Sequence, residues 1–246
     1  MSKSTAKRVS VITDNNICAV NEKILRAAAG FAAVNQKKEL ANIFIIVPDR
    51  FTLQAEKILT GFAGCLLGCR VVTFSMLFSL LHGAEGKDKI IDKTTAVLFT
   101  WRAVQSVRGE LLYFSNSVDQ YAFAEKMFNT INQLTSCRAD FDNLEKNAKT
   151  QVTKRKMHDI ALIQKRYKEL IKDSIDGAGM LGWLIDNAAA SPIIKDAHVY
   201  MTGFEYLSVQ REEVMSRIFS ATKSFTVGCR EGSELQRSLN EIRFAM

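Results

Sequence analysis

The sequence has few residues that break or cross-link a polypeptide. It contains only two prolines, Pro48 and Pro192, among 246 residues, so no proline-rich linker separates its parts. Its five cysteines are scattered along the chain: Cys18, Cys65, Cys69, Cys137 and Cys229. An odd, scattered set predicts reduced thiols rather than a disulfide framework. The nearby pair Cys65 and Cys69 supplies too few ligands for a zinc or iron–sulfur site.

Long apolar runs are also missing. No stretch approaches the roughly 18 uninterrupted apolar residues that a membrane-spanning helix needs. The basic N-terminal segment MSKSTAKRVSVITD lacks the apolar core of a secretory signal. We therefore expect a soluble, cytoplasmic protein with no membrane partner. Its apolar share of 47% and charged share of 24% are typical of a globular chain, with one core or a core and an inserted subdomain.

Residue groups that carry catalysis are scarce. The three histidines, His82, His158 and His198, lie far apart in the sequence, and none has a second ligand at metal-binding spacing. Ser75 and Ser208 lack the glycine-flanked turn of a hydrolase nucleophile. The sequence therefore predicts no catalytic residue and no metal site.

Short apolar runs rich in β-branched residues do occur, near both ends of the chain. They span residues 8–13, 42–47, 70–74, 198–204 and 223–228. Such near-continuous runs suit parallel strands that are buried on both faces, and the segments between the first three have the length and period of crossover helices. We predict an α/β fold: a parallel sheet with helices on both faces.

The middle of the chain follows a different pattern. From about residue 77 to residue 190 the strand signal gives way to successive helical periods, so we predict an all-helical insertion in the sheet. The expected domains are 1–84 with 192–246, and 85–191. Trp101 and Trp183 lie on amphipathic helices of the insertion and are expected in its core.

The loops at the carboxyl edge of such a sheet form its usual ligand site. After the first strand the sequence reads TDNNICAVNEK, with no glycine and no lysine before Lys23, whereas a nucleotide-binding loop needs glycines and a lysine to hold phosphate. After the fourth strand, Thr202 and Gly203 stand where an Asp-Glu pair would hold Mg²⁺. We therefore expect that this sheet does not hydrolyse ATP.

Positive charge is concentrated in one helical segment. The chain carries 33 basic against 26 acidic residues, and the stretch 145–172 alone has nine Lys or Arg against three acids. Helical spacing places four lysines together on one face: Lys154, Lys165, Lys168 and Lys172. This face is either a solvated helix surface or a surface that contacts nucleic-acid phosphates without reading sequence.

Three segments carry a family resemblance: VPDRFTLQAEKIL, VVTFSMLFSLL and MTGFEYLSVQREEVMSRIF. Together with the order of the predicted elements, they resemble the N-terminal region of AddB, also called RexB, the B subunit of bacterial ATP-dependent helicase-exonucleases. The resemblance implies a P-loop-NTPase-like sheet similar to the first motor domain of UvrD-like helicases, but degenerate and used for DNA binding. Some family members keep a phosphate-binding loop after the first strand, and this sequence departs from them.

The resemblance also implies roles for residues and partners. The loops after the second and third strands correspond to DNA-contacting motifs, which gives Arg50, Thr52, Gln54, Thr73 and Ser75 as DNA-binding positions. The family's ATP, magnesium and iron–sulfur cluster belong to motifs or regions that are absent here, so no cofactor is expected. The expected partners are single- or double-stranded DNA and an AddA-type helicase-nuclease subunit. The family's nuclease domain lies much further along a longer chain, so we expect a fragment or truncated product that is inactive alone.

The loop after the second strand has a mechanism for DNA binding. Arg50, Thr52 and Gln54 lie near a helix start, where side-chain and backbone donors could hold a phosphate of single-stranded DNA. Phe51 or Phe74 could stack on a base. Each residue also has a structural alternative: helix capping for Thr52, the helix surface for Gln54, the core for Phe51 and Phe74, and pairing with Asp49 or Glu56 for Arg50.

Three functions remain open from the sequence. The first is a non-catalytic DNA-binding scaffold within a helicase-nuclease that acts in double-strand-break repair and recombination. The second is a protein-interaction module that only docks the partner subunit. The third is a domain with residual nucleotide binding, which Mg-ATP would stabilise against heat.

Overall fold

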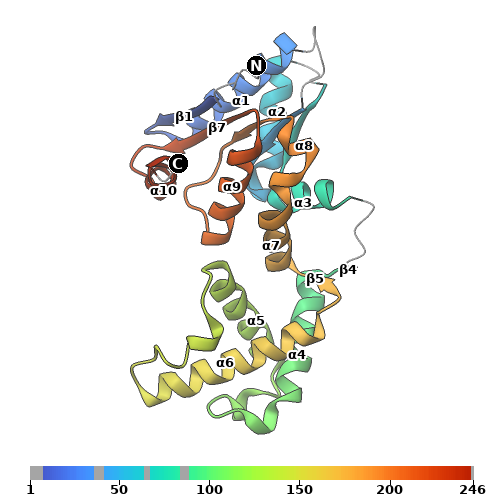
Figure 1. Ribbon diagram of the computed structural model, residues 1–246, viewed down its shortest axis with the longest axis vertical. Coiled ribbons are helices and arrows are strands. Elements are labelled where there is room, and N and C mark those ends of the chain that lie inside the picture. The colour runs from blue at the N-terminus through green and yellow to red at the C-terminus, as the bar shows by residue number, and fades with distance from the viewer. Residues whose placement is uncertain (1–7, 36–41, 64–66, 84–88, 245–246) are drawn as a thin grey trace, which may run out of the picture. The chain divides into compact units, whose positions relative to one another are not determined.

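The computed structural model describes residues 8–35, 42–63, 67–83 and 89–244 (Figure 1). Its contacts divide the chain into two compact units. The first, called the α/β unit here, comprises Met1–Ala84 and Trp183–Met246; the second, called the helical unit, comprises Glu85–Gly182.

The α/β unit is built on a five-stranded sheet in which every neighbouring pair of strands is parallel. Its strands are β1 (Arg8–Asp14), β2 (Asn42–Ile46), β3 (Cys69–Val72), β6 (Ala197–Met201) and β7 (Ser224–Arg230). Their order across the sheet is β1-β7-β6-β2-β3. The predicted parallel α/β sheet is therefore confirmed, and each predicted apolar run overlaps one of these strands.

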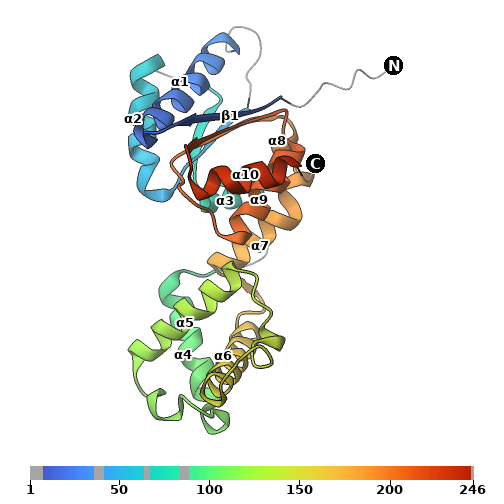
Figure 2. The ribbon, with the colours of Figure 1, turned by 90° about the vertical axis from the view of Figure 1, so that its left-hand side faces the viewer.

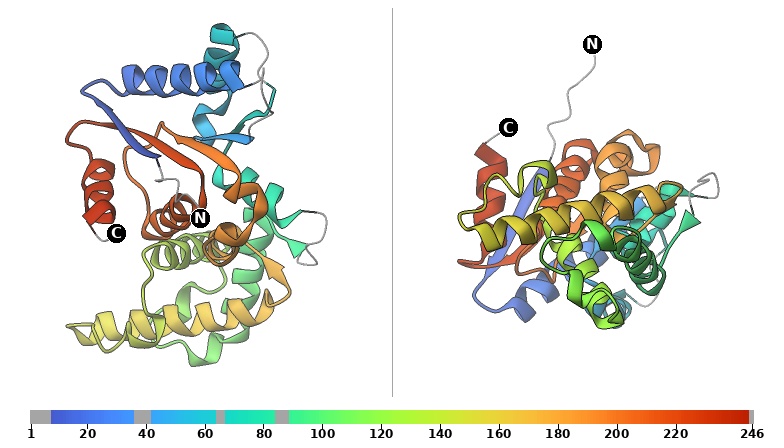
Figure 3. Two further views of the ribbon diagram at one scale, coloured as in Figure 1. Left: turned by 45° about the horizontal axis from the view of Figure 1, so that its top comes forward. Right: turned by 90° about the horizontal axis from the view of Figure 1, so that it is seen from below.

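Helices cover both faces of this sheet (Figures 2 and 3). One face carries α1 (Ile17–Asn35) and α2 (Thr52–Ala63), and the other carries α3 (Phe74–His82), α8 (Pro192–Lys195), α9 (Val209–Ala221) and α10 (Glu234–Phe244). Because both faces are covered, Ile43 to Ile46 of β2 are all buried, as expected for a central parallel strand.

A glycine brings α1 close to the sheet. A Cβ atom added to Gly228 of β7 would lie 2.6 Å from side-chain atoms of both Ile24 and Val20. Real Cβ atoms do not approach other atoms so closely, so a larger residue here would push α1 away from β7. Gly228 therefore sets the short distance between α1 and β7.

The helical unit has its own core. Its helices are α4 (Lys93–Ser106), α5 (Tyr121–Ser136), α6 (Gln151–Leu170) and the start of α7 (Gly177–Asn187). Buried residues from three of them, Val104, Phe128 and Ile163, belong to one hydrophobic cluster. The unit also contains a short parallel ladder of β4 (Lys89–Ile90) and β5 (Ser174–Ile175). The prediction of an all-helical insertion missed this ladder, because two-residue strands leave no readable period.

The two tryptophans lie outside the core that the sequence suggested for them. Trp101 of α4 is 39% exposed, so its expected burial is wrong. Trp183 belongs to the α/β unit and packs edge-on against Phe78 of α3, with ring centroids 5.4 Å apart. The contacts thus divide the chain inside α7, before the boundary expected at residues 191 and 192. None of the helices in the described ranges is long and apolar enough to cross a bilayer.

Candidate nucleic-acid interface

The loops that follow the strands meet at the carboxyl edge of the sheet. Backbone hydrogen bonds link the strand ends there: the N–H of Thr202 donates to Ile46 O at 3.1 Å, and the N–H of Val47 donates to Val72 O at 3.0 Å. On the other side of the sheet, the N–H of Glu231 donates to Asp14 O at 3.0 Å. The carboxyl ends of these strands therefore lie along one rim, at which the sequence predicts a ligand site.

At this rim, the start of α1 is closed by the chain's own side chains. Asn16 Oδ1 accepts the N–H of Cys18 at 2.9 Å, and Asp14 Oδ1 accepts the N–H of Asn16 at 3.0 Å. The second oxygen of Asp14 pairs with Lys23 Nζ at 2.7 Å. The pKa of the Asp14 carboxyl is lowered, first by the hydrogen bond from Lys23 and then by the N–H of Asn16. Two N–H groups that could bind an anion near this helix start, those of Asn16 and Cys18, are thus already used.

A buried hydrogen bond closes the neighbouring position. The hydroxyl of Thr202, after β6, donates to Asn21 Oδ1 of α1 at 2.7 Å, and both residues are buried. Neither side chain carries a charge. This hydrogen bond therefore joins two places directly. One is the position after β6 where a metal-binding pair would lie, and the other is α1, the helix whose start would bind phosphate.

Gly203 continues this close packing. Its φ of +85° is a conformation that residues with a Cβ rarely adopt. An added Cβ would lie 2.9 Å from Pro48 Cδ and 3.2 Å from Phe51 Cδ1. A glycine is therefore required for the loop after β6 to rest against the turn that precedes α2.

An open cavity of about 680 Å³ lies beside this packed region, between α1 and α2. Three polar side chains of α2 and the turn before it line the cavity: Arg50, Gln54 and Lys57. Their spacing of four and three residues places them on one face. Arg50 and Lys57 are exposed, and within the described residues neither forms an ion pair. Glu205 also lines the cavity.

The apolar part of the cavity comes from both helices. Ile17 of α1, and Ile58 and Phe62 of α2, line it. The guanidinium of Arg26 lies 4.8 Å from the centre of the Phe62 ring, and Arg26 also pairs with Glu22 at 2.9 Å. The cavity therefore combines an apolar wall with the cationic ends of two side chains from the α2 segment.

Thr52 and Phe51 make contacts within the chain. The Thr52 hydroxyl donates to Asp49 O at 3.0 Å, and Thr52 is not part of the cavity lining. The ring of Phe51 touches the cavity, but the residue is only 9% exposed and belongs to the core between α1, α2 and the sheet. The core alternative for Phe51 therefore describes it better than base stacking.

Thr73 and Ser75 use their hydroxyl groups at the start of α3. Thr73 Oγ1 accepts the N–H of Met76 at 3.2 Å and lies 2.8 Å from Ser75 Oγ. Thr73 is buried and Ser75 is exposed. Phe74 is 7% exposed and packs against Phe204 with centroids 5.9 Å apart, so its ring is a core residue. The structure does not bring Thr73 or Ser75 into the cavity that holds Arg50 and Gln54.

The basic face of α6 lies in the helical unit. Lys154, Lys165 and Lys168 are exposed on α6, whereas Lys172 is exposed but lies beyond the end of the helix at Leu170, outside the predicted helical face. Lys165 and Lys168 border an open cavity of about 590 Å³ together with three acidic residues: Asp142, Glu145 and Glu169. Glu169 pairs with Arg166 at 2.6 Å, and Glu145 lies 3.4 Å from His158 Nδ1. The positive field of these two lysines is thus partly offset by neighbouring carboxylates.

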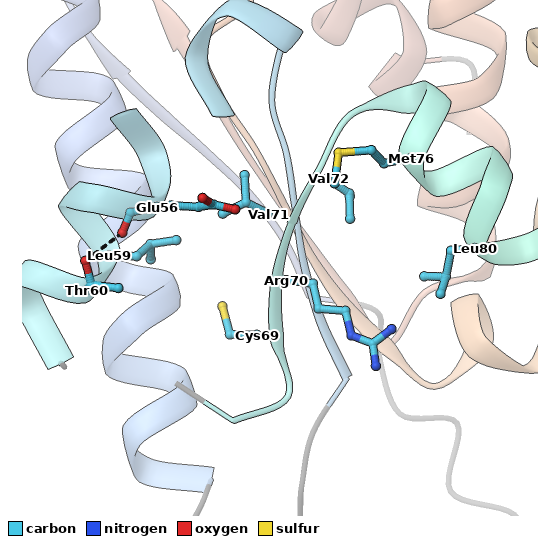
Figure 4. Close-up of a pocket in the computed structure, with 9 residues that line it drawn as sticks. All are labelled: Glu56, Leu59, Thr60, Cys69, Arg70, Val71, Val72, Met76 and Leu80. Atoms are coloured by element: carbon cyan, nitrogen blue, oxygen red, sulfur yellow. Dashed lines mark hydrogen bonds between the residues drawn. The ribbon is translucent and has the colours of Figure 1, made fainter. Parts of the chain in front are cut away.

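A third cavity follows the open edge of the sheet (Figure 4). Among the described residues, β3 pairs with β2 only. A space of about 470 Å³ runs along β3 between α2 and α3, and Figure 4 shows Leu59 on the α2 side and Met76 and Leu80 on the α3 side. Met76 is 48% exposed. This edge offers an apolar groove with Arg70 and Glu56 at its borders.

Metal-binding groups are not gathered in the parts of the chain that the structure describes, where no three His, Cys, Asp or Glu side chains cluster. Burial raises the pKa of the Cys69 thiol to about 11, which keeps it protonated near neutral pH. Its sequence neighbour Cys65 lies outside the described residues.

Two contributors to the rim were not among the predicted site residues. Lys57 was missed, although its spacing from Arg50 and Gln54 on a predicted helix could have revealed it. Asn21 was missed because its partner Thr202 is distant in sequence, and no local pattern joins them.

The fold and its rim define the class of protein. A five-stranded parallel sheet with helices on both faces, interrupted by a helical unit, is an α/β fold of the P-loop-NTPase type. A family model described as "ADDB, N-terminal" matches residues 24–241. The chain therefore belongs to the AddB N-terminal family, and the resemblance drawn from its motifs is confirmed.

Several similar proteins share one name, that of an ATP-dependent helicase/deoxyribonuclease B subunit. The chain is 27% identical over 221 residues to the protein of this name from Listeria welshimeri, covering 83% of this chain and 18% of that protein. The one from Lachnoclostridium phytofermentans is 24% identical over 200 residues, covering 78% and 17%. The one from Lactobacillus helveticus is 24% identical over 230 residues, covering 89% and 19%. The chain thus spans less than a fifth of the length of these relatives.

Proposed function

We propose that this chain is a non-catalytic DNA-binding region of the B subunit of an ATP-dependent helicase-nuclease, acting in double-strand-break repair and recombination. The observation that carries the proposal is the contrast at the rim of the sheet. The positions of a phosphate loop and a metal-binding pair are closed by Asn16 and by the Asn21–Thr202 bond. The adjacent cavity instead presents Arg50 and Lys57, which form no ion pair among the described residues, although Glu22 and Glu205 also line it.

The residues at the rim do not suit a magnesium nucleotide. A triphosphate needs free N–H groups and a cation at a helix start, and there Asn16 and Asp14 already accept hydrogen bonds while Lys23 is paired with Asp14. Mg²⁺ prefers carboxylate oxygens, and the buried pair offers an amide and a hydroxyl. We therefore propose that the chain needs no nucleotide for its role.

A polynucleotide suits the open cavity better. Arg and Lys contact phosphates and release counterions from the strand, which supplies affinity without sequence reading. Gln54 adds an amide donor on the same face of α2. Thr52, Thr73 and Ser75 remain predicted contacts, although their hydroxyl groups are engaged within the chain. The basic face of α6 would add a second, weaker phosphate surface.

A salt titration of single-stranded DNA binding tests this proposal. In fluorescence anisotropy with a labelled oligothymidylate, affinity should fall linearly with log salt, and Arg50→Ala with Lys57→Ala should make that slope shallower by about 1.4, since each phosphate contact contributes roughly 0.7. The control pair Arg70→Ala with Arg217→Ala removes the same charge from exposed positions of the same unit and should leave the slope nearly unchanged. Weak binding that ignores salt would overturn the proposal.

The α6 lysines are tested in the same titration. Replacing Lys165, Lys168 and Lys172 by Ala should lower the slope by up to about 2 if each contacts one phosphate. The nearby carboxylates of Asp142 and Glu145 reduce the expected effect. A slope identical to that of the unmodified chain would remove this face from the DNA path.

A second function is favoured by the groove along β3. An open parallel edge flanked by exposed Met76 and by Leu80 suits a polypeptide rather than a phosphate strand. In this alternative the chain docks an AddA-type helicase-nuclease subunit. It predicts that Met76→Asp weakens binding to that purified subunit while DNA affinity stays unchanged, and an unaltered affinity for the subunit would contradict it.

A further inference from the structure

The helical unit exposes two consecutive side chains, Leu112 and Tyr113, in the segment between α4 and α5. Leu112 and Tyr113 follow the 3-10 turn Arg108–Glu110 and are 54% and 43% exposed. The backbone of this loop is held from below.

A buried carboxylate holds this loop. Asp159 of α6 is fully buried, and its two oxygens accept the N–H groups of Leu112, Tyr113 and Phe114 at 2.8, 2.9 and 2.9 Å. Three donors from consecutive residues satisfy the charge, so the carboxylate is stable without a cation. The loop therefore presents Leu112 and Tyr113 outward in one defined conformation.

One cation of α6 lies over the exposed ring. Lys156 Nζ is above a face of the Tyr113 ring, 4.6 Å from its centre, and Phe114 meets that ring edge-on at 5.0 Å. Arg155 is exposed and forms no ion pair with any residue the structure describes. Arg155 and Lys156, consecutive on α6, outnumber the single Asp159 carboxylate that lies beneath the loop.

These cations are distinct from the predicted lysine face. Lys156 and Lys168 are twelve positions apart on α6, which at 3.6 residues per turn places them about 120° apart around the helix axis. An exposed aromatic ring with basic neighbours is the combination that binds single-stranded nucleic acid, where the ring stacks on a base and the cations meet the phosphates.

We propose that Tyr113 and Leu112 form a stacking platform for one nucleobase of a DNA strand, whose flanking phosphates are bound by Arg155 and Lys156. This inference rests on the proposed DNA-binding function and adds a base contact on the helical unit. The positive surroundings favour a polynucleotide over an apolar protein surface, because a protein partner would have to cover both cations.

The test pairs a protein change with a DNA change. Tyr113→Ala should weaken binding of a labelled oligothymidylate by about fivefold or more, the lower end of base–aromatic stacking, whereas Tyr113→Phe should bind like the unmodified chain. On a strand of the same length in which every base is replaced by a tetrahydrofuran abasic site, Tyr113→Ala and the unmodified chain should bind equally. Tyr121→Ala, which removes another exposed tyrosine of the same unit, is the matched control and should change neither affinity.

Each outcome has a separate meaning. Equal binding of Tyr113→Ala and the unmodified chain to the normal strand overturns the platform while leaving the proposed function intact, and it would point to a protein partner for this loop. An equal loss on normal and abasic strands also overturns it, because a stacking contact needs the base. No salt-dependent DNA binding by the unmodified chain would remove the proposed function itself.

A second measurement guards against a folding defect. Photo-crosslinking of the unmodified chain to a strand containing 5-iododeoxyuridine should attach the strand to Tyr113, as identified by mass spectrometry of the crosslinked peptide. Crosslinks confined to other residues would overturn the platform even if Tyr113→Ala failed to fold.

Discussion

Two helix starts at the same rim of the sheet have opposite character. At the start of α1, Asn16 accepts the N–H of Cys18, and Asp14 accepts the N–H of Asn16 and pairs with Lys23. The α2 segment presents Arg50 and Lys57 to an open cavity, where they form no ion pair among the described residues although Glu22 and Glu205 also line it. Both follow parallel strands, so the sheet offers the same geometry to each. The difference between the two starts therefore comes from their side chains.

The largest effect should follow from breaking the buried bond that closes the first start. Asn21→Leu removes the acceptor of the Thr202 hydroxyl and leaves that buried hydroxyl unpaired, so it should lower the free energy of unfolding by about 1 to 3 kcal/mol in urea denaturation. Asn21→Leu combined with Thr202→Val replaces both polar groups and should recover most of the loss. A double variant as unstable as the single one would show that the bond is not what matters there.

A smaller loss should come from the cap of α1. Asn16→Ala removes the acceptor for the N–H of Cys18 and should cost about 1 kcal/mol in the same measurement. Asn15→Ala changes an exposed neighbouring asparagine and should stay within about 0.5 kcal/mol. If both variants lower the free energy of unfolding equally, the hydrogen bond from Asn16 to the N–H of Cys18 does not stabilise the start of α1.

Acid should weaken the closure at α1 through Asp14. Its folded-state pKa is lowered, chiefly by Lys23, so its contribution to stability is present above the unfolded pKa near 3.8 and is lost as pH falls through the folded value. Lys23→Ala should raise the pKa of the Asp14 carboxyl toward its usual value, as measured by a carbon-13 NMR titration. Arg26→Ala, which removes a cation from the same helix, should leave that pKa unchanged, and an unshifted titration in Lys23→Ala would contradict the assigned cause.

No effect is expected from magnesium nucleotide. If α1 is closed as its hydrogen bonds indicate, saturating Mg-ATP should leave the thermal unfolding midpoint of the chain where it was. A nucleotide present at about a hundred times its dissociation constant would instead stabilise the folded state by about 2.7 kcal/mol. A clear rise in the unfolding midpoint with Mg-ATP, but not with magnesium alone, would show that the chain binds nucleotide and would contradict the expectation that the start of α1 is closed.

The sheet was predictable because its central strands are nearly continuous apolar runs. Residues 43 to 46 are buried because helices cover both faces of the sheet. A strand buried on both faces consists almost entirely of apolar residues, and this is why the run could be recognised in the sequence. The short ladder of β4 and β5 could not be recognised in this way, since two residues are too few to show an alternation of apolar and polar side chains. Trp101 was placed in the core from the amphipathic period of its helix, and the structure exposes it because the period alone does not fix which residues border the buried face.

The site was predictable only in part. Arg50 and Gln54 lie together as their spacing implies, and Lys57 follows the same rule. The engagement of Thr73 with Ser75 and with the N–H of Met76 is local and could have been read as a helix cap. The closure by Asn21 and Thr202 joins residues from opposite ends of the chain, and the Asp159 contacts join different helical segments, so neither has a local sequence signal.

The strand order has a consequence for synthesis on the ribosome. Among the described residues β1 has a single neighbour, β7, with Arg8 opposite Ser224, so β1 cannot form this pairing until β7 has been translated. At roughly 5 to 20 residues per second that delay is on the order of 10 to 40 s. During it, the apolar side of α1 has no completed sheet to cover, so this helix stays exposed to water until β7 emerges.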